Sequence, residues 1–230
     1  MPYTPDEFEA KLWELMKSKR NGDEAAFLKA GLDQEQLQKW VKHTYVSIRE
    51  FTTYLANIHA KCPHFDARIE IAHNMYDEHG HFQPEKDHST LWRKLGRAVG
   101  VSDQDMEAFF WEHIDDPSYF PLHRVLSDIT LNRSFVEGLA AVCFAIEAGT
   151  PETFRQWLPV LREKYGFSDD TLEFILLHIG ADEVHSRRGI DVIKKYATTD
   201  EMQANALKAA EEVLNMTGPA AYRRAEARAG

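Results

Sequence analysis

Apolar residues recur at intervals of three and four along almost the whole chain, and this helical spacing constrains the fold more than any other feature of the sequence. Leu91, Leu95 and Val99 share one face of a predicted helix, and similar stripes run through residues 7–17 and 66–78. No run of alternating Val, Ile and Thr residues is long enough to suggest a strand. The pattern therefore predicts an all-α helical bundle.

Residues that start and stop helices divide the chain. Asp33, Ser102 and Thr199 are of the type that accepts hydrogen bonds from the first turn of a helix. No repeat, linker or low-complexity segment intervenes, so we expect one domain over residues 1–230 with a frayed tail at 219–230. The predicted helices are residues 7–17, a long helix after Asp33, residues 66–78, a helix from Asp87 or Ser89 to Gly100, a helix from Ser102, residues 134–148, a helix from Thr150 to Gly166, residues 168–195 and a helix from Thr199 to near Gly218, with a bent connection at residues 115–121.

Composition excludes several classes of protein. The 37 acidic and 27 basic residues give a net charge of −10, which argues against binding to a nucleic acid duplex. Two cysteines cannot form a disulfide framework or a thiolate zinc site, and no P-loop, nucleotide-binding glycine motif or GxSxG elbow is present. The start of the chain lacks a signal-peptide pattern, and the longest apolar run, residues 139–146, is too short to span a bilayer. We therefore expect a cytoplasmic protein that binds neither nucleic acid nor membrane.

The strongest local motif is His178-x3-Asp182-x2-His185. On an α-helix these positions lie within about 60° of one another, so two imidazoles and one carboxylate point the same way. Iron and related divalent metals favour this ligand set, and Gly180 leaves room for a neighbouring helix. The alternative is a solvated polar face. Apolar residues such as Ile175 argue instead for a buried helix, where unpartnered ionisable groups cost several kcal/mol.

Glu147 lies near the end of an apolar stretch, residues 134–148, and shares a helical face with Ala140 and Cys143. Its position four residues before Pro151 fits a solvent-exposed helix end. If Glu147 points inward instead, its two carboxylate oxygens are suited to bridging two cations. The sequence leaves both interpretations open. Cys143, in the same apolar stretch, is typical of a buried, inert thiol rather than a nucleophile.

Residues 73–88 hold more potential metal ligands than one site could use. Glu78, at a predicted helix end, and His88, at the start of the next helix, could converge across the loop between them. A solvated, histidine-rich loop is the alternative. A rival ligand pair is Glu70-x-x-His73, which would repeat the carboxylate–x–x–His spacing found in ferritin-like di-iron bundles.

Several short segments, taken in order, resemble the haem-oxygenase-like superfamily that includes PqqC and TenA. The resemblance covers roughly residues 31–196, and it implies a haem-oxygenase-like bundle of seven or eight core helices, commonly dimeric, with the site between central helices. Residues 38–45, 60–63, 77–80, 88–92 and 96–100 resemble the superfamily as a whole, and residues 137–141, 146–147 and 178–185 resemble its metal-dependent branch, the haem-oxygenase-like di-iron oxidases and oxygenases.

Carried over to this chain, the resemblance implies a shell of three imidazoles and three carboxylates. Such a shell would hold two ferrous ions per chain, with manganese as the alternative metal and O2 as co-substrate. The loop between Glu78 and His88 is longer than the family pattern, so Asp77, His79 and His81 are candidates to replace Glu78. The six implied metal ligands are Glu78, His88, Glu147, His178, Asp182 and His185.

The resemblance also implies a reaction, the O2-dependent oxidation of a small amine- or carboxylate-bearing substrate derived from an amino acid, by N-oxygenation or oxidative C–C cleavage. No catalytic residue beyond the metal centre can be assigned from the sequence. Two alternatives stay open: a metal-free PqqC-like oxidase or TenA-like hydrolase on the same fold, and a non-catalytic helical regulator. We expect a homodimer. The arginines that could hold a substrate carboxylate are Arg49, Arg68, Arg133 and Arg187.

Overall fold

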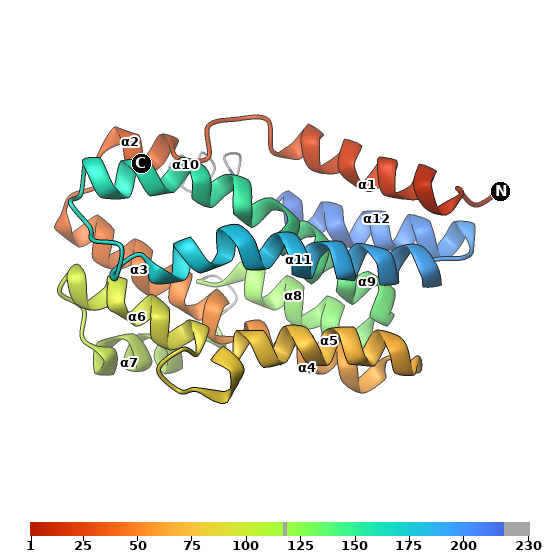
Figure 1. Cartoon of the computed structure of the whole chain (residues 1–230), viewed down its shortest axis with the longest axis horizontal. Coiled ribbons are helices and arrows are strands. Elements are labelled where there is room, and N and C mark those ends of the chain that lie inside the picture. The colour runs from red at the N-terminus through yellow and green to blue at the C-terminus, as the bar shows by residue number, and fades with distance from the viewer. Residues whose placement is uncertain (117–118, 219–230) are drawn as a thin grey trace.

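The structure is a computed structural model that describes residues 1–116 and 119–218. All regular structure within these residues is helical, which confirms the all-α prediction (Figure 1). The predicted tail, residues 219–230, and part of the predicted bend at 115–121 lie outside the described residues. The helices are α1 (Pro5–Lys19), α2 (Ala26–Ala30), α3 (Gln34–Arg49), α4 (Phe51–Lys61), α5 (Phe65–Glu78), α6 (His88–Ala98), α7 (Asp103–His113), α8 (Pro121–Asn132), α9 (Phe135–Leu139), α10 (Thr150–Glu163), α11 (Glu173–Tyr196) and α12 (Asp200–Leu214), with three short helical segments, η1 (Gly80–Phe82), η2 (Ala140–Ile146) and η3 (Glu147–Gly149).

The predicted helix starts are largely confirmed by their hydrogen bonds. The side chains of Asp33, Ser102 and Thr199 each accept a hydrogen bond from a backbone N–H in the first turn of α3, α7 and α12. Asp87 does the same for α6, through the N–H of Ser89. These caps satisfy donors that would otherwise lack partners, and they place the start of each helix at a defined residue.

Two predicted helices differ from the structure. The long helix expected from residue 168 begins only at Glu173, because Ser168 accepts a hydrogen bond from the Thr171 N–H and closes a turn first. The helix expected over residues 134–148 widens into a π-helix at η2, where the Glu147 N–H bonds to the Val142 carbonyl five residues earlier. Such widening is rare in helices and is frequent at functional sites.

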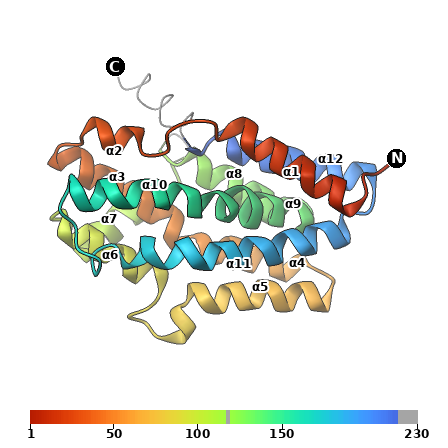
Figure 2. The same cartoon turned by 45° about the horizontal axis from the view of Figure 1, so that its top comes forward.

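Helix α11 runs through the middle of the bundle, with α10 on one side and α5 and α6 on the other (Figures 1 and 2). It connects two clusters of buried apolar side chains. Ile175 belongs to the cluster formed with α3, α6, α7 and α10, whereas Ile193 belongs to the cluster formed with α1, α4, α8 and α12. The stretch of α11 that lies between these two residues therefore packs one face against the bundle, and it carries the His-x3-Asp-x2-His motif.

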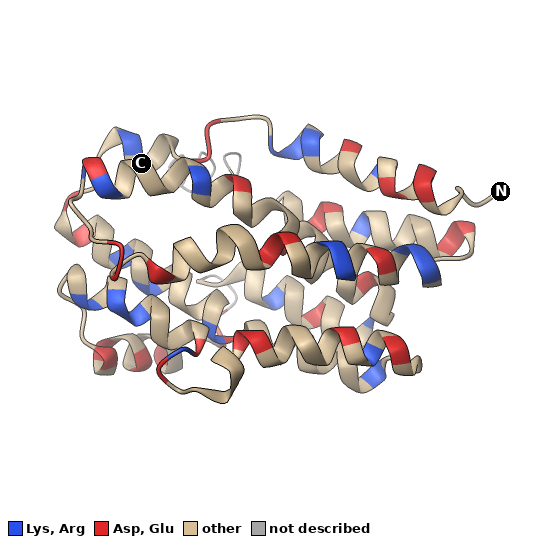
Figure 3. Ribbon diagram, in the orientation of Figure 1, with Lys and Arg blue, Asp and Glu red and all other residues tan. Residues whose placement is uncertain are grey.

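The helix surfaces carry both signs of charge, since acidic and basic residues both occur on most helices in view (Figure 3). In the described part of the chain, no helix is both long enough and apolar enough to cross a bilayer.

Candidate metal centre

The three residues of the α11 motif lie together on a buried face. His178, Asp182 and His185 are at most 5% exposed, whereas Leu177 and Val184, which face away from them, are 43% and 49% exposed. This is the arrangement that helical spacing predicts for positions i, i+4 and i+7. The solvated-face alternative for this helix is therefore wrong.

The close helix approach expected at Gly180 occurs elsewhere on α11. A Cβ atom added at Gly180 would meet nothing within 4 Å, so this position faces open space. Gly189 is the residue in close contact, because a Cβ atom there would lie 2.4 Å from the Cβ atom of Cys143. Helix α11 therefore packs against η2 through Gly189, just beyond the motif.

Glu147 points into the bundle and is 1% exposed, so the solvent-exposed interpretation of this residue is wrong. It lies at the junction of the π-helix η2 and the 3-10 turn η3. A π-helical turn contains more residues than an α-helical turn. Residue 147 therefore lies on a different side of this segment than it would in an uninterrupted α-helix. Glu147 faces α11, with Oε1 3.8 Å from Nδ1 of His185.

Glu78 and His88 converge across the loop between α5 and α6. The Nδ1 atom of His88 lies 2.7 Å from Oε2 of Glu78, and both residues are buried. The loop makes its turn through three consecutive residues with positive φ angles, Gly80, His81 and Phe82. A Cβ atom on Gly80 would lie 2.2 Å from the backbone of the returning chain, so only glycine fits this position.

The candidates that could have replaced Glu78 lie outside the cluster. The imidazoles of His79 and His81 are 43% and 56% exposed, and Asp77 contacts His185 from the side away from the other carboxylates. The rival pair is also excluded by position, since Glu70 and His73 are not buried and Glu70 lies 3.7 Å from Arg188.

The six side chains implied by the resemblance form two groups that share Glu78. In each group, one potential ligand atom per residue lies within 4.8 Å of all the others. The Nε2 atom of His178 is 3.9 Å from Oε1 of Glu78, and Nδ1 of His185 is 3.9 Å from Oδ1 of Asp182. Glu78 is therefore placed to bridge the two groups, which are Glu78, His88 and His178, and Glu78, Glu147, Asp182 and His185.

The second group contains polar atoms that have no partner in the protein. Glu147 Oε2, Asp182 Oδ1 and His185 Nδ1 are buried, and within the described part of the chain they accept or donate no hydrogen bond. Leaving such atoms unsatisfied costs about 1–3 kcal/mol each, and more for a charged group. A metal cation would compensate three converging carboxylates, and imidazole and carboxylate are ligands that iron takes. The residues present therefore fit a metal centre.

Burial and mutual repulsion shift the pKa values of these groups in the metal-free protein. Burial raises the pKa of Glu147 to about 7, and it raises the pKa of Asp182 well above its usual range, with the charges of Glu147 and Glu78 adding to the effect. Burial also lowers the pKa of His178 to about 4, assisted by the nearby His88. Burial therefore disfavours the charged forms of these three groups, and a bound cation would favour the charged forms of the two carboxylates.

Further residues hold the imidazoles and carboxylates in place. The Nδ1 atom of His178 lies 2.7 Å from the Phe174 carbonyl, which leaves Nε2 directed at Glu78. Asn74 Nδ2 donates to Glu147 Oε1 at 2.7 Å. Partners of this kind fix ring orientation and tautomer at metal sites. Asn74 was not among the residues selected from the sequence, although its position four residues before Glu78 places both on one face of α5.

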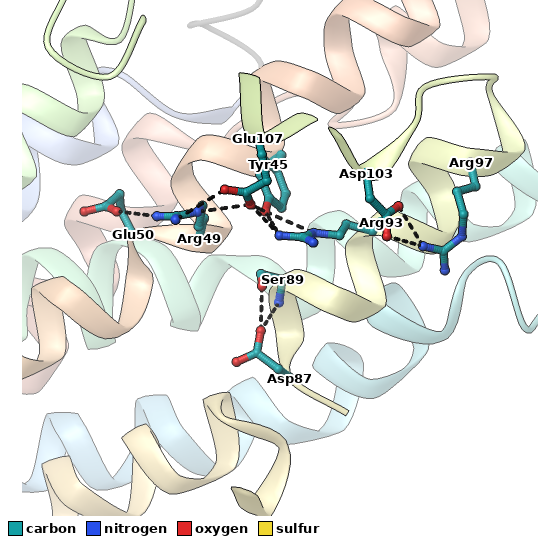
Figure 4. Close-up of polar contacts among 9 residues, drawn as sticks. All are labelled: Tyr45, Arg49, Glu50, Asp87, Ser89, Arg93, Arg97, Asp103 and Glu107. Carbon is teal, nitrogen blue, oxygen red and sulfur yellow. Dashed lines mark hydrogen bonds and ion pairs between the residues drawn. The ribbon is translucent and has the colours of Figure 1, made fainter. Parts of the chain in front are cut away.

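Helix α6, which begins with His88, is anchored by a polar network on its outer side (Figure 4). Arg93 on α6 donates to both Tyr45 on α3 and Glu107 on α7, and Tyr45 donates to Glu107. Arg49 reaches the same carboxylate from α3, 3.3 Å from Nε to Oε1. The network joins α3, α6 and α7, and so it holds in place the helix that begins with His88.

A cavity of about 280 Å³ adjoins the cluster, and Glu78, Glu147, His178 and Asp182 form part of its wall. Most of the remaining wall is apolar. Two further charged residues, Arg20 and Glu24, line it, and sequence analysis did not select either. Their only signal in the sequence is a spacing of four residues, which is common on protein surfaces. The apolar and aromatic residues of the wall include Ile48, Phe51, Leu122, Phe154, Trp157 and Phe174.

None of the arginines that the sequence suggested for a substrate carboxylate lines this cavity among the described residues. Arg133 pairs with Asp128 and Glu212, and Arg187 pairs with Glu9 and Asp191, both on the outside of the bundle. Arg49 lines a separate, more polar cavity on the other side of Glu78 and His88.

Comparisons with known proteins agree with this geometry. The chain is 31% identical over 195 residues to a 4-aminobenzoate synthase of Nitrosomonas europaea, covering 80% of this chain and 76% of that protein. It is 29% identical to a 4-aminobenzoate synthase of Chlamydia trachomatis, with coverage of 80% and 76%. A TenA homologue from Pseudomonas syringae has the same fold, with a TM-score of 0.74 at 15% identity, covering 91% of this chain and 87% of that one.

The model of one protein family, described as iron-containing redox enzymes, matches residues 38–218. The matched range includes all six residues of the buried cluster and the helices α5, α6, α10 and α11. The haem-oxygenase-like fold expected from the sequence is confirmed by the structural likeness. With most of its length matched and a buried set of iron-type ligands at its centre, this chain belongs to the family of iron-containing redox enzymes.

Proposed function

We propose that this protein is a non-haem di-iron enzyme that oxidises a small substrate with O2. The observation that carries the proposal is the shared carboxylate: Glu78 belongs to both groups of ligand atoms, so two metal ions can be held side by side. The proposed ligands are Glu78, His88 and His178 for one ion, and Glu147, Asp182 and His185, together with Glu78, for the other. Ferrous iron at such a site supplies electrons and open coordination positions for O2.

The contribution of the chain itself is to position the ligands and to exclude water. Phe154 and Phe174 lie against the imidazole of His178, with ring centroids at 6.2 and 3.9 Å, and both rings line the cavity beside it. The cavity beside the cluster therefore presents a mostly apolar space to a substrate and keeps bulk water from the reacting atoms.

The substrate that we propose is a small amine- or carboxylate-bearing molecule, oxidised by N-oxygenation or by oxidative C–C cleavage. The name of the relatives supports this class, because 4-aminobenzoate carries both groups. We infer that this chain acts on a substrate, or forms a product, of similar size. Liquid chromatography with mass detection of 4-aminobenzoate, after aerobic turnover of the iron-loaded protein, tests this more specific assignment.

Two observations count against the alternatives on the same fold. The described wall of the cavity contains no tyrosine, which a metal-free acid–base oxidase would be expected to use. Cys143, the nucleophile that a TenA-like hydrolase would need, is buried, does not line this cavity, and has a pKa raised by burial. A non-catalytic regulator would have no reason to retain buried carboxylates that lack partners.

The test is an anaerobic titration with ferrous iron, in which we expect about two ions to bind per chain. Substituting His178→Ala or Asp182→Ala should remove most of the bound iron while helical circular dichroism is unchanged. The matched controls are His73→Ala and Glu70→Ala, which alter the exposed rival pair and should leave iron binding intact. A folded wild-type protein that binds no iron would overturn the proposal.

A cytoplasmic location and a homodimer complete the proposal. Both follow from the resemblance and composition, and light scattering on the purified, iron-loaded protein tests the second.

A further inference from the structure

One end of the cavity carries a buried ion pair that the metal centre does not use. Arg20, just beyond the end of α1, donates from Nε to Glu24 Oε1 at 2.9 Å, and the two side chains are 12% and 4% exposed. Among the described residues lining the cavity, these are the only charged ones outside the proposed ligands. The pair is therefore a second charged feature of a mostly apolar space.

The pair is held rigidly against α10. Arg20 Nη2 donates to Thr153 Oγ1 at 2.6 Å. The backbone of Glu24 is fixed twice, because its N–H donates to Gln156 Oε1 at 2.9 Å and its carbonyl accepts from Trp157 Nε1 at 2.8 Å. Such support is typical of a preformed binding position rather than of a mobile surface pair.

A glycine makes room for this arrangement. A Cβ atom on Gly149 would lie 1.6 Å from Arg20 Nη1 and 2.6 Å from its Cζ atom, so any other residue at position 149 would displace the guanidinium. Gly149 lies two residues after Glu147, and the same turn therefore shapes both ends of the cavity.

One oxygen of this pair is left without a partner. Glu24 is 3% exposed, and its Oε2 atom is buried and accepts no hydrogen bond from the residues that the structure describes. Arg20 satisfies only Oε1, which leaves a carboxylate oxygen unpaired in a mostly apolar wall. Because an unpaired buried acceptor costs about 1–3 kcal/mol, a ligand that donates a hydrogen bond here would recover that cost.

Both charged features of the cavity lie beside the start of α10. Gly149, the residue before α10, leaves room for Arg20, and Thr150 lines the cavity together with Asp182 of the cluster. The cavity of about 280 Å³ that joins the two features has room for one aromatic ring with a polar group at each end.

We propose that Glu24 is a specificity residue whose Oε2 atom accepts a hydrogen bond from an uncharged aromatic amino group of the ligand, with the opposite end of the ligand at the metal centre. The Arg20–Glu24 pair is electrically neutral, so binding a neutral amine buries no net charge, whereas an ammonium group would bury one. This inference rests on the proposed function, because it takes the cavity to be the substrate site.

The test compares three para-substituted benzoates, two of one shape and one a methylene longer, on the full-length, iron-loaded protein under anaerobic conditions, by isothermal titration calorimetry. The probes are 4-aminobenzoate, 4-methylbenzoate, whose methyl group has the size of an amino group but no donor, and 4-(aminomethyl)benzoate, which carries an ammonium. We expect 4-aminobenzoate to bind about tenfold more tightly than either of the others, since a hydrogen bond to a charged acceptor contributes about that much.

In Glu24→Gln, the side-chain NH2 group can occupy the position of Oε2, where it cannot accept a hydrogen bond from the ligand's amino group. We expect the preference for 4-aminobenzoate over 4-methylbenzoate to fall to about threefold or less. Glu85→Gln is the matched control, because it makes the same chemical change on an exposed residue that does not line the cavity, and it should retain the full preference.

Equal binding of 4-aminobenzoate and 4-methylbenzoate, tighter binding of the ammonium probe, or no binding of any probe would overturn the inference. The wild-type comparison decides the matter even if Glu24→Gln fails to fold. The ferrous iron titration separates the two proposals: a protein that binds iron and does not discriminate between the probes loses this inference and keeps its proposed function.

Discussion

Asp77 and His185 are joined by a 2.9 Å contact between Oδ2 and Nε2, although they lie on different helices, α5 and α11. The contact occupies the imidazole nitrogen that faces away from the cluster, so Nδ1 is directed at Glu147 and Asp182. Asp77 was a candidate ligand from sequence. In the structure, Asp77 instead orients His185, which is a proposed ligand.

Replacing this carboxylate should weaken metal binding without removing a ligand. We expect Asp77→Asn to lower the affinity for ferrous iron by about 10–100-fold, because the tautomer and orientation of His185 are then less well defined. A competition titration with a coloured ferrous chelator measures the change. His81→Asn is the control, since it removes the other partner of Asp77, 2.9 Å away, and keeps the contact with His185. Unchanged affinity in Asp77→Asn would contradict the role.

Neutralising a proposed ligand should have opposite effects on the metal-free and metal-bound proteins. Asp182 is buried beside two other carboxylates, so Asp182→Asn removes repulsion and should raise the Tm of the metal-free protein by about 3–8 °C. The same change should abolish the stabilisation that iron gives the wild type. Thermal unfolding with and without ferrous iron under nitrogen measures both. A lower metal-free Tm together with normal iron stabilisation is the outcome that would count against a metal centre.

His43 should make stability depend on pH. Burial, together with the charges of Lys39, His113 and Lys42, lowers the pKa of His43 from 6.5 to about 4. The unfolded chain therefore binds more protons than the folded one between these values, and the contribution of His43 is present above pH 6.5 and lost as the pH falls toward 4. After allowance for solvent screening, the change is about 1 kcal/mol.

His43→Phe isolates this contribution, because it keeps an aromatic ring against Tyr119, whose centroid is 5.1 Å away. Urea unfolding of both proteins from pH 4.5 to 7.5 gives the difference in unfolding free energy. We expect the advantage of the wild type to grow as the pH rises through this range. If the difference in unfolding free energy does not vary with pH, the imidazole of His43 has the same protonation state in the folded and the unfolded protein, which contradicts the prediction.

Two glycines on α11 should respond to alanine in opposite ways. Gly189→Ala places a methyl group 2.4 Å from the Cβ atom of Cys143 and should destabilise the protein by about 1–3 kcal/mol. Gly180→Ala enters open space within the helix and should stabilise it by about 0.5–1 kcal/mol. Urea unfolding of the two variants and the wild type provides the comparison. If both changes destabilise equally, the packing of α11 on η2 is not as described.

Neither cysteine should behave as a nucleophile. Cys62 and Cys143 are each 3% exposed, and burial raises the pKa of both thiols. We expect the folded protein to react with a thiol reagent on the order of 100-fold more slowly than the urea-unfolded protein. Cys143→Ser should leave iron binding intact. Rapid labelling of one thiol in the folded state would reopen the hydrolase alternative.

Local features of the sequence were sufficient for most of the helices, though not for α2, α4 and α8, and for one part of the site. Helix caps such as Asp33 and Thr199 act through hydrogen bonds within a few residues, so their role is visible in the sequence. The shared face of His178, Asp182 and His185 depends only on the rise and twist of one helix. The family resemblance added the order in which the other three residues follow along the chain.

The inward orientation of Glu147 could not be decided from the sequence. An α-helix and a π-helix place the same residue on different sides, and which one forms depends on packing against α11 and α12. The same holds for Asp77, which is adjacent to Glu78 in sequence and has a different role because it faces another helix. Arg20 and Glu24 reach the cavity only because α10 packs beside them.

The sequence by itself determined that this chain is helical, where most helices begin, and which residue types could bind a metal, because these properties arise from contacts between near neighbours along the chain. Only the tertiary structure decided that Glu78 joins two groups of ligands, that Glu147 faces inward and that Glu24 retains a free oxygen in the cavity. Those relationships connect residues far apart in sequence, and they depend on how whole helices pack, which no local pattern encodes.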